Sequence, residues 1–249
     1  MKVRLKVSVA ACLLATACAG GEGAKDTAAR AAAPAAVGDE RADAMSGAAS
    51  SPEAPRGTAT SGRPTVLVVG TSLTAGLGLD PDSAYPAVLQ RMADSAGYAV
   101  RVVNAGLSGE TSAGALRRLE WLLRQPAAVV MIETGANDGL RGLDVDSTRA
   151  NLTAIVREVK RALPAAAVLL VQMEAPPNLG DDYTRRFREN YPLVARREGA
   201  ALVPFLLAGV AGDRRLNQAD GIHPTEAGAR VVARNVWPTL EPYLARLAK

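Results

Sequence analysis

Four polar segments of the sequence carry groups that could take part in acyl transfer. They contain Ser72, Gly109, Asn137 and the pair Asp220 and His223. A serine hydroxyl is a weak nucleophile near neutral pH and needs a base such as imidazole beside it. His223 is the single histidine of the chain, and Asp220, three residues earlier, could hold its second ring nitrogen. These residue types indicate a nucleophile, a base and an acid that orients the base.

The same segments also offer hydrogen-bond donors for a developing oxyanion. These donors are the backbone N–H groups of Ser72 and Gly109 and the side-chain amide of Asn137. A donor that is already aimed at the oxygen of a tetrahedral intermediate can contribute ~3–4 kcal/mol to its stability. We therefore interpret the three groups as a candidate oxyanion hole.

Each segment taken alone also has a purely structural interpretation. Ser72 could be a helix N-cap or a turn residue, and Gly109 could be a turn residue with positive φ. Asn137 lies in a sequence rich in turn chemistry, and His223 could be incidental at a capped helix start. The occurrence of all four segments together is what favours the catalytic interpretation.

Composition excludes several other kinds of site. The two cysteines, Cys12 and Cys18, both lie in the first 18 residues, so the rest of the chain has no disulfide or cysteine-ligated zinc. One histidine excludes sites with several histidine ligands, and we expect no metal and no cofactor. Without Lys2, Arg4 and Lys6, which lie in a candidate signal, the net charge falls from +4 to +1. This balance, with only nine aromatic residues, argues against a nucleic-acid partner.

The segments that must position the chemistry alternate between short apolar runs and longer amphipathic runs. Candidate strands cover residues 65–69, 100–104, 128–133, 167–172 and 201–204, and candidate helices cover 84–96, 111–124, 146–162, 183–198 and 225–247. This order, with continuous β-branched runs, predicts an α/β fold: a three-layer α/β/α sandwich around a five-stranded parallel sheet. In such a sheet, ligand-binding and active sites lie at the carboxyl ends of the strands. The polar segments come after the candidate strands, so we expect them at this edge of the sheet.

The first 63 residues differ in composition from the rest of the chain and do not show its alternation of strand and helix patterns. Residues 1–18 predict a signal peptide, because a basic start precedes an apolar run of 11 residues that is too short to span a bilayer of ~30 Å. Leu14-Ala15-Thr16-Ala17-Cys18 resembles a bacterial lipoprotein lipobox, although Ala15 stands where Leu is usual. The resemblance implies lipidation of Cys18; an ordinary secreted protein that is cleaved nearby is the alternative.

Residues 19–63 are interpreted as a disordered tether. They contain 15 Ala among 45 residues and no Leu, Ile, Phe, Tyr or Trp, so they cannot bury enough apolar area to offset chain entropy. Residues 64–249 have the length of a single domain. We therefore expect an exported protein, anchored to a membrane as a lipoprotein and facing the periplasm or the cell exterior.

From about residue 66 to residue 244, the chain resembles the SGNH (GDSL-type) serine hydrolases. It is most similar to their bacterial exported branch of thioesterase, lysophospholipase and arylesterase activity. The motifs that carry the resemblance are Gly70-Thr71-Ser72-Leu73, Gly109, Gly135-Ala136-Asn137-Asp138 and Asp220-Gly221-Ile222-His223-Pro224. The resemblance implies a flavodoxin-like fold, with Ser72 as nucleophile, His223 as base and Asp220 orienting the base. It also implies an oxyanion hole formed by Ser72, Gly109 and Asn137.

One position departs from the first motif, since Thr71 stands where the family has Asp. That residue is not part of the triad, so we expect the chemistry to be retained. A threonine can still cap the following helical turn. The geometry and electrostatics near Ser72 are what the change puts in question.

The resemblance also implies a substrate class. We expect small-molecule or lipid esters: aryl and short- to medium-chain acyl esters, lysophospholipids and acyl thioesters. Leu140 and Leu179, in the loops 138–143 and 174–182, would either contact the acyl chain or pack these loops. The alternatives are a carbohydrate O-deacetylase of the same superfamily and a non-catalytic surface-binding lipoprotein. We expect a monomer.

Overall fold

The computed structural model describes residues 62–248, which form a five-stranded parallel sheet. The strands are β1 (Thr65–Gly70), β2 (Arg101–Gly106), β3 (Val129–Ile132), β4 (Ala167–Val171) and β5 (Ala201–Val203). Their order is β2-β1-β3-β4-β5 and every pairing is parallel. This confirms the predicted sheet. The predicted signal peptide, Cys18 and nearly all of the predicted tether lie outside the described residues.

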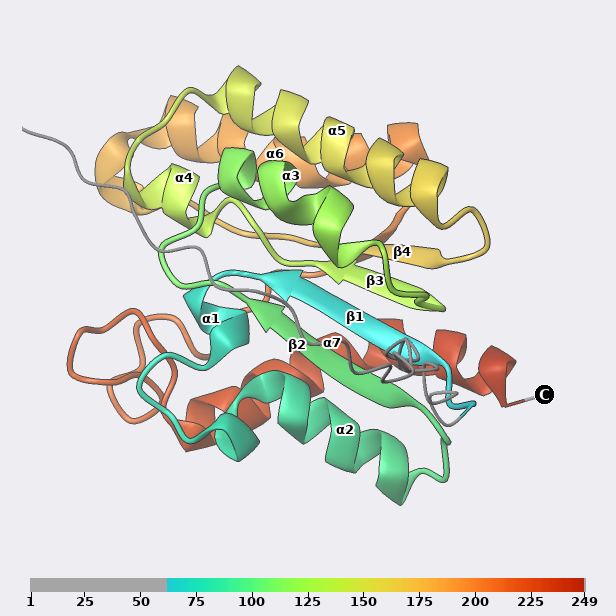
Figure 1. The fold of residues 1–249 in the computed structure, drawn as a ribbon. Helices are drawn as coiled ribbons and strands as arrows, with labels where there is room; N and C mark the ends of the chain where they lie inside the picture. Colours follow the sequence, from blue (N-terminus) through green and yellow to red (C-terminus); the bar gives the residue numbers. More distant parts are fainter. Residues whose placement is uncertain (1–61, 249) are drawn as a thin grey trace, which may run out of the picture. The chain divides into compact units, whose positions relative to one another are not determined.

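Helices cover both faces of the sheet, as Figure 1 shows. The helices are α1 (Ser72–Ala75), α2 (Tyr85–Ser95), α3 (Ser112–Leu122), α4 (Ala136–Leu140), α5 (Val145–Ala162), α6 (Asp181–Glu198) and α7 (Glu226–Leu247), with short 3₁₀ turns at Pro81–Ser83 and Pro177–Leu179. α3, α5 and α6 lie on one face, and α2 and α7 lie on the other. The predicted three-layer α/β/α sandwich is therefore confirmed. No helix within residues 62–248 is both long and apolar enough to cross a membrane.

The core is built on the central strands. The side chains of β1 from Val66 to Val69 and all four residues of β3 are buried, because these strands have a neighbour on each side and helices on both faces. β2 departs from the expectation of strands buried on both faces: Arg101 and Asn104 are exposed. Its position at the edge of the sheet leaves it with one neighbouring strand, β1.

Most boundaries lie within two residues of the predicted ones, but two short helices were not predicted. α1 and α4 follow β1 and β3 directly. Thr71 caps α1 by accepting a hydrogen bond from Leu73 N at 3.4 Å, and Gly135, with φ of 99°, precedes α4. The segment of α4 was interpreted as a turn and that of α1 as either a turn or a helix start, because a single helical turn leaves no periodic apolar pattern.

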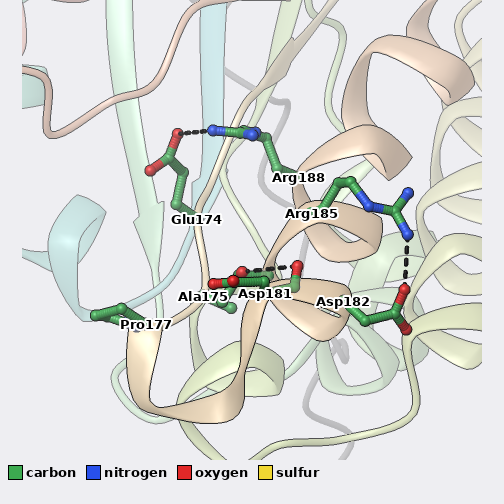
Figure 2. Close-up of a pocket in the computed structure, with 8 residues that line it drawn as sticks. Glu174, Ala175, Pro177, Asp181, Asp182, Arg185 and Arg188 are labelled. Atoms are coloured by element: carbon green, nitrogen blue, oxygen red, sulfur yellow. Dashed lines mark hydrogen bonds and ion pairs between the residues drawn. The ribbon is translucent and has the colours of Figure 1, made fainter.

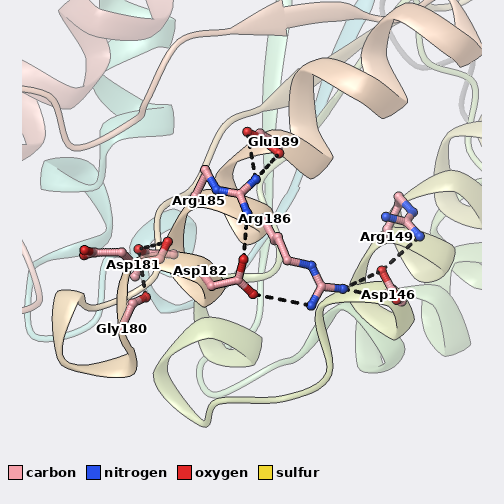
Figure 3. A network of polar contacts seen from close by, with 9 residues as sticks. Asp146, Arg149, Gly180, Asp181, Asp182, Arg185, Arg186 and Glu189 are labelled. Atoms are coloured by element: carbon pink, nitrogen blue, oxygen red, sulfur yellow. Dashed lines mark hydrogen bonds and ion pairs between the residues drawn. The ribbon is translucent and has the colours of Figure 1, made fainter.

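Exposed ion pairs lie at the start of α6, and one of them connects it to α5 (Figure 3). Arg186 lies 3.3 Å from Asp146 and 3.8 Å from Asp182. Arg185 lies 2.6 Å from the same Asp182 and 3.3 Å from Glu189. Exposed pairs each contribute little to stability. Three of these pairs lie within α6, and only Arg186–Asp146 joins α6 to α5.

Candidate active site

The predicted catalytic segments meet at the point where the strand order reverses. The chain passes from β1 to the neighbouring β2 and then crosses to β3 on the other side of β1. Ligand sites of open parallel sheets lie at the carboxyl ends of strands around such a point. Ser72 follows β1, Gly109 follows β2 and Asn137 follows β3. The topology therefore places the three segments at one edge of the sheet.

Ser72 is the first residue of α1 and is not its N-cap. The cap is Thr71, whose hydroxyl accepts the N–H of Leu73. One of the two structural interpretations of Ser72 is thereby excluded, and its hydroxyl is left free for another partner. That partner is His223, whose Nε2 lies 2.8 Å from Ser72 Oγ.

His223 is held in turn by Asp220. The Nδ1 atom of the ring lies 2.6 Å from Asp220 Oδ2. The other carboxylate oxygen, Oδ1, accepts the backbone N–H groups of Ile222 at 2.9 Å and His223 at 3.0 Å. Gly221, with φ of 71°, makes the tight turn that permits this double contact. The structure thus brings Ser72, His223 and Asp220 into one hydrogen-bonded row.

Asp220 is held in its ionised form by the groups that contact it. The hydrogen bond from the His223 side chain, followed by those from the two backbone N–H groups, lowers the pKa of Asp220 to about 2. The carboxylate is therefore ionised at neutral pH and favours a proton on Nδ1, which leaves Nε2 free to accept the serine proton. Across residues 62–248, no group of three or more His, Cys, Asp or Glu side chains is placed to hold a metal ion.

The two remaining oxyanion candidates are held by contacts that the sequence did not reveal. Gly109 adopts φ of 76°, and its carbonyl oxygen accepts Arg141 Nη2 at 2.9 Å. Asn137 Nδ2 donates to the carbonyl oxygen of Glu110 at 3.0 Å, and the second amide hydrogen of Asn137 is then available to a ligand. Arg141 was not among the residues singled out in the sequence, because its contact with the Gly109 carbonyl oxygen depends on the tertiary structure.

A buried aspartate next to Asn137 joins three elements beneath this loop. Asp138 accepts the backbone N–H of Ser112 at 2.8 Å and its hydroxyl at 2.5 Å. It also accepts the hydroxyl of Thr148 at 3.4 Å. The start of α4 is thereby connected to the starts of α3 and α5, which fixes the backbone that carries the Asn137 amide.

The predicted acyl-contact residues lie near one another but differ in exposure. Leu140 is 46% exposed, whereas Leu179 is half-buried and its Cδ2 would lie 3.5 Å from a Cβ placed on Gly142. Leu179 therefore packs against the loop that follows α4, and Leu140 is open to solvent.

A hollow of about 680 Å³ lies beside the loop after β4 (Figure 2). Its lining includes Glu174, Asp181, Asp182, Arg185 and Arg188, and it does not include the Ser72–His223 pair. Such a charged lining does not suit an acyl chain. We therefore do not assign this hollow as the acyl-binding site.

Residues 68–231 match the GDSL-like Lipase/Acylhydrolase family. This span covers well over half of the chain and includes all four motif segments. The chain belongs to this family. As a member of the GDSL-like lipase/acylhydrolase family, it is an enzyme that hydrolyses ester bonds.

Individual relatives agree with this assignment. The chain is 46% identical over 181 residues to "Esterase TesA" of Pseudomonas aeruginosa, covering 72% of this chain and 89% of the relative. It is 37% identical over 179 residues to "Thioesterase 1/protease 1/lysophospholipase L1" of Escherichia coli K12, covering 72% and 84%. Among solved structures, "Crystal Structure of TesA" has a TM-score of 0.69 at 46% identity and covers 72% of this chain and 99% of that chain.

Proposed function

We propose that the chain is a serine esterase that acts through an acyl-enzyme on Ser72. The observation that carries the proposal is the row of hydrogen bonds from Ser72 Oγ to His223 Nε2 at 2.8 Å and from His223 Nδ1 to Asp220 Oδ2 at 2.6 Å. The names of similar proteins, esterase, thioesterase and lysophospholipase, support ester and thioester substrates.

In the first half of the reaction, Ser72 Oγ attacks the carbonyl carbon while its proton passes to His223 Nε2. The negative charge that develops on the carbonyl oxygen is stabilised by the N–H groups of Ser72 and Gly109 and by the Asn137 amide. The intermediate then collapses as the alcohol or thiol leaves with the proton from His223. Asp220 keeps the ring oriented and stabilises the imidazolium while it exists.

In the second half, a water molecule gives its proton to His223 and attacks the acyl carbon. The carboxylic acid leaves and the proton returns to Ser72, so that the enzyme is restored. The proposed substrates are aryl and short- to medium-chain acyl esters, lysophospholipids and acyl thioesters. Leu140 and Leu179 are proposed to contact the acyl chain.

The test combines a substrate series with a covalent label on the full-length chain. p-Nitrophenyl esters from acetate to laurate, a lysophospholipid and an acetylated sugar are assayed with the wild type and with Ser72→Ala. The variant Ser95→Ala, at an exposed serine, serves as the control. We expect Ser72→Ala to lose at least ~10³-fold in kcat/KM, and a fluorophosphonate to label the wild type at Ser72.

The other outcomes identify the alternatives. Hydrolysis confined to the acetylated sugar would point to an O-deacetylase. Equal rates for wild type and Ser72→Ala on every substrate, with no label on Ser72, would point to a non-catalytic binding protein. Labelling of a different residue would overturn the assignment of the nucleophile.

We also propose that the enzyme is exported and anchored through lipid on Cys18. The support is the sequence of residues 1–18, with its basic start, apolar run and lipobox-like end. In a bacterial host, Cys18→Ser should move the protein out of the membrane fraction, whereas Cys12→Ser should not. Equal membrane retention of both variants would contradict lipidation at Cys18.

A further inference from the structure

A carboxyl group that the proposed reaction does not use lies buried beside the nucleophile. Glu133 comes directly after β3, and its side chain has no exposed surface. A buried carboxylate is costly unless its oxygens are hydrogen-bonded or paired with a cation. The hydrogen bonds to Glu133 come from neutral donors, and these donors belong to the segment that carries Ser72.

The donors flank Ser72 on both sides in the sequence. The backbone N–H of Thr71 donates to Glu133 Oε2 at 2.9 Å, and the Thr71 hydroxyl lies 3.0 and 3.1 Å from the two carboxylate oxygens. The Thr74 hydroxyl donates to Oε2 at 2.7 Å. Since this bond uses the only proton of that hydroxyl, Tyr85 must donate to Thr74 Oγ1 across their 2.8 Å contact. The donors therefore all point toward the carboxylate.

The carboxylate also lies close to the backbone that enters the nucleophile turn. A Cβ placed on Gly70 would come within 2.6 Å of Glu133 Oε2 and would collide with the Thr74 hydroxyl. Glycine at position 70 thus allows Glu133 to approach the chain where β1 ends. The residue that stands in place of the family aspartate, Thr71, supplies a hydroxyl donor to the same group.

These contacts fix the peptide group from which Ser72 starts. The Thr71 N–H and hydroxyl are held by Glu133, and the Thr71 carbonyl oxygen accepts Ala75 N at 2.9 Å. With both ends of Thr71 held, the direction of the Ser72 N–H and the position of its Cα are set. These are the atoms that present the candidate nucleophile and one oxyanion donor.

We propose that Glu133 is a positioning residue for the nucleophile, and that its ionised carboxylate holds the turn through Thr71 and Thr74. The inference rests on the proposed function of Ser72. Protonation would remove the negative charge and convert one carboxylate oxygen from an acceptor into a donor, which weakens the hydrogen bonds that the two hydroxyls donate to Glu133. The turn would loosen, and Ser72 would be presented less often in line with His223.

Other titratable groups lie near Glu133 on neighbouring elements. Tyr85 on α2 and Tyr191 on α6 are buried, and burial raises the pKa of each phenol well above 10. Arg118 on α3 reaches Gly70 O at 3.3 Å and is paired with Glu110 at 2.6 Å. Burial raises the pKa of Glu133 itself to about 7, despite the hydrogen bonds that lower it.

The test measures kcat and KM for p-nitrophenyl acetate between about pH 5 and about pH 9, at a wavelength where the product absorbs equally at all pH values. The form with Glu133 ionised gives the full rate, and the form with Glu133 protonated should retain roughly 1–10% of it. Titration of Glu133 should therefore make the acid limb of log kcat/KM steeper in the wild type than in a variant that cannot ionise at this position. In Glu133→Gln, we expect kcat to fall by ~10–100-fold with KM within about twofold, and the slope to fall to about 1.

Control variants distinguish a positioning role of Glu133 from a general loss of folding or stability. Glu120→Gln, at an exposed carboxylate on α3, should leave kcat and slope unchanged. A folded Glu133→Gln enzyme with wild-type kcat and wild-type slope would overturn the proposal. If this variant does not fold, Thr74→Val is compared with Thr74→Ser, which retains the hydroxyl. We expect Thr74→Val to lower kcat and to move the acid limb to higher pH, and identical profiles for the two would overturn the proposal.

Failure of this inference can be told apart from failure of the proposed function. If the wild type is labelled at Ser72 by a fluorophosphonate but Glu133→Gln behaves as wild type, only the positioning role is wrong. If the wild type is not labelled and hydrolyses no better than Ser72→Ala, the proposed function itself is wrong.

Discussion

Asp220 Oδ2 lies 2.6 Å from His223 Nδ1, and the two residues are three positions apart in the same loop. The carboxylate proposed to orient the base is therefore not brought from a separate strand. Its second oxygen accepts the N–H groups of Ile222 and His223, so that one side chain both shapes the loop and holds the ring. The position of the base relative to Asp220 is set locally, and its position relative to Ser72 is set by packing.

This local arrangement predicts a large effect of Asp220→Asn. An asparagine can still accept the two backbone N–H groups through its oxygen, but its amide would then face His223 Nδ1 and favour the wrong tautomer. We expect kcat to fall by ~10³–10⁴-fold with little change in KM. Steady-state kinetics on p-nitrophenyl acetate measure this effect, with Asp82→Asn at an exposed position as the control. A loss below tenfold would contradict the assigned role of Asp220.

Substitutions at the candidate oxyanion hole should lower kcat to different extents. Asn137→Ala removes a side-chain donor, and we expect kcat to fall by ~10²–10³-fold while KM changes little. Arg141→Ala removes the contact with Gly109 O, and because this arginine is exposed, we expect a smaller loss of about 5–10-fold. Arg141→Lys should retain part of the activity. If Asn137→Ala raised KM with kcat unchanged, Asn137 would contribute equally to binding of the substrate and of the transition state, and would not act as an oxyanion donor.

The raised pKa of Glu133 predicts that its contribution to the free energy of unfolding decreases as pH rises. Burial raises its pKa from 4.5 to about 7, so the folded state retains a proton that the unfolded state releases. The free energy of unfolding is therefore highest below about pH 4.5, decreases by ~3 kcal/mol between about pH 4.5 and about pH 7, and then levels off. This decrease is the contribution of Glu133 alone and is superimposed on that of all other groups.

Urea unfolding at about pH 5 and about pH 8 isolates this contribution by comparing the wild type with Glu133→Gln. The glutamine variant cannot ionise, so the wild type should lose most of the ~3 kcal/mol relative to it between these two pH values. Glu120→Gln provides the matched comparison at an exposed carboxylate. Parallel pH dependence in wild type and Glu133→Gln would show that Glu133 does not titrate in this range.

Leu140 predicts a change in acyl-chain preference. Because its side chain is 46% exposed beside the candidate site, truncation to alanine should cost little stability. We expect Leu140→Ala to lower kcat/KM for p-nitrophenyl octanoate by ~10-fold and to leave the acetate ester unchanged. Leu247→Ala, at an exposed position on α7, is the control. Equal losses on both esters would mean that Leu140 packs the loop and does not contact the acyl chain.

Much of the fold could be predicted because its signals are local. The apolar β-branched runs of β1 and β4 and the periodic helices between strands appear in any short window of the sequence. Parallel order then follows from their alternation. The sequence suggested a helical turn after Thr71 but did not predict the extent of α1, and it did not predict α4, which follows Gly135. It also did not predict the partial exposure of β2, which follows from its place at the edge of the sheet.

For the site, the sequence alone determined which residue types are available: one histidine, an aspartate three residues before it, and polar segments after the first three strands. It also determined the pairing of Asp220 with His223, because a turn of three residues leaves few other geometries. Only the tertiary structure decided that Ser72 Oγ meets His223 Nε2, since these residues are 151 positions apart. The same holds for Arg141 on Gly109 and for Glu133 beneath Thr71 and Thr74. Contacts between distant segments depend on how strands are ordered and helices packed, and no local pattern in the sequence records that outcome.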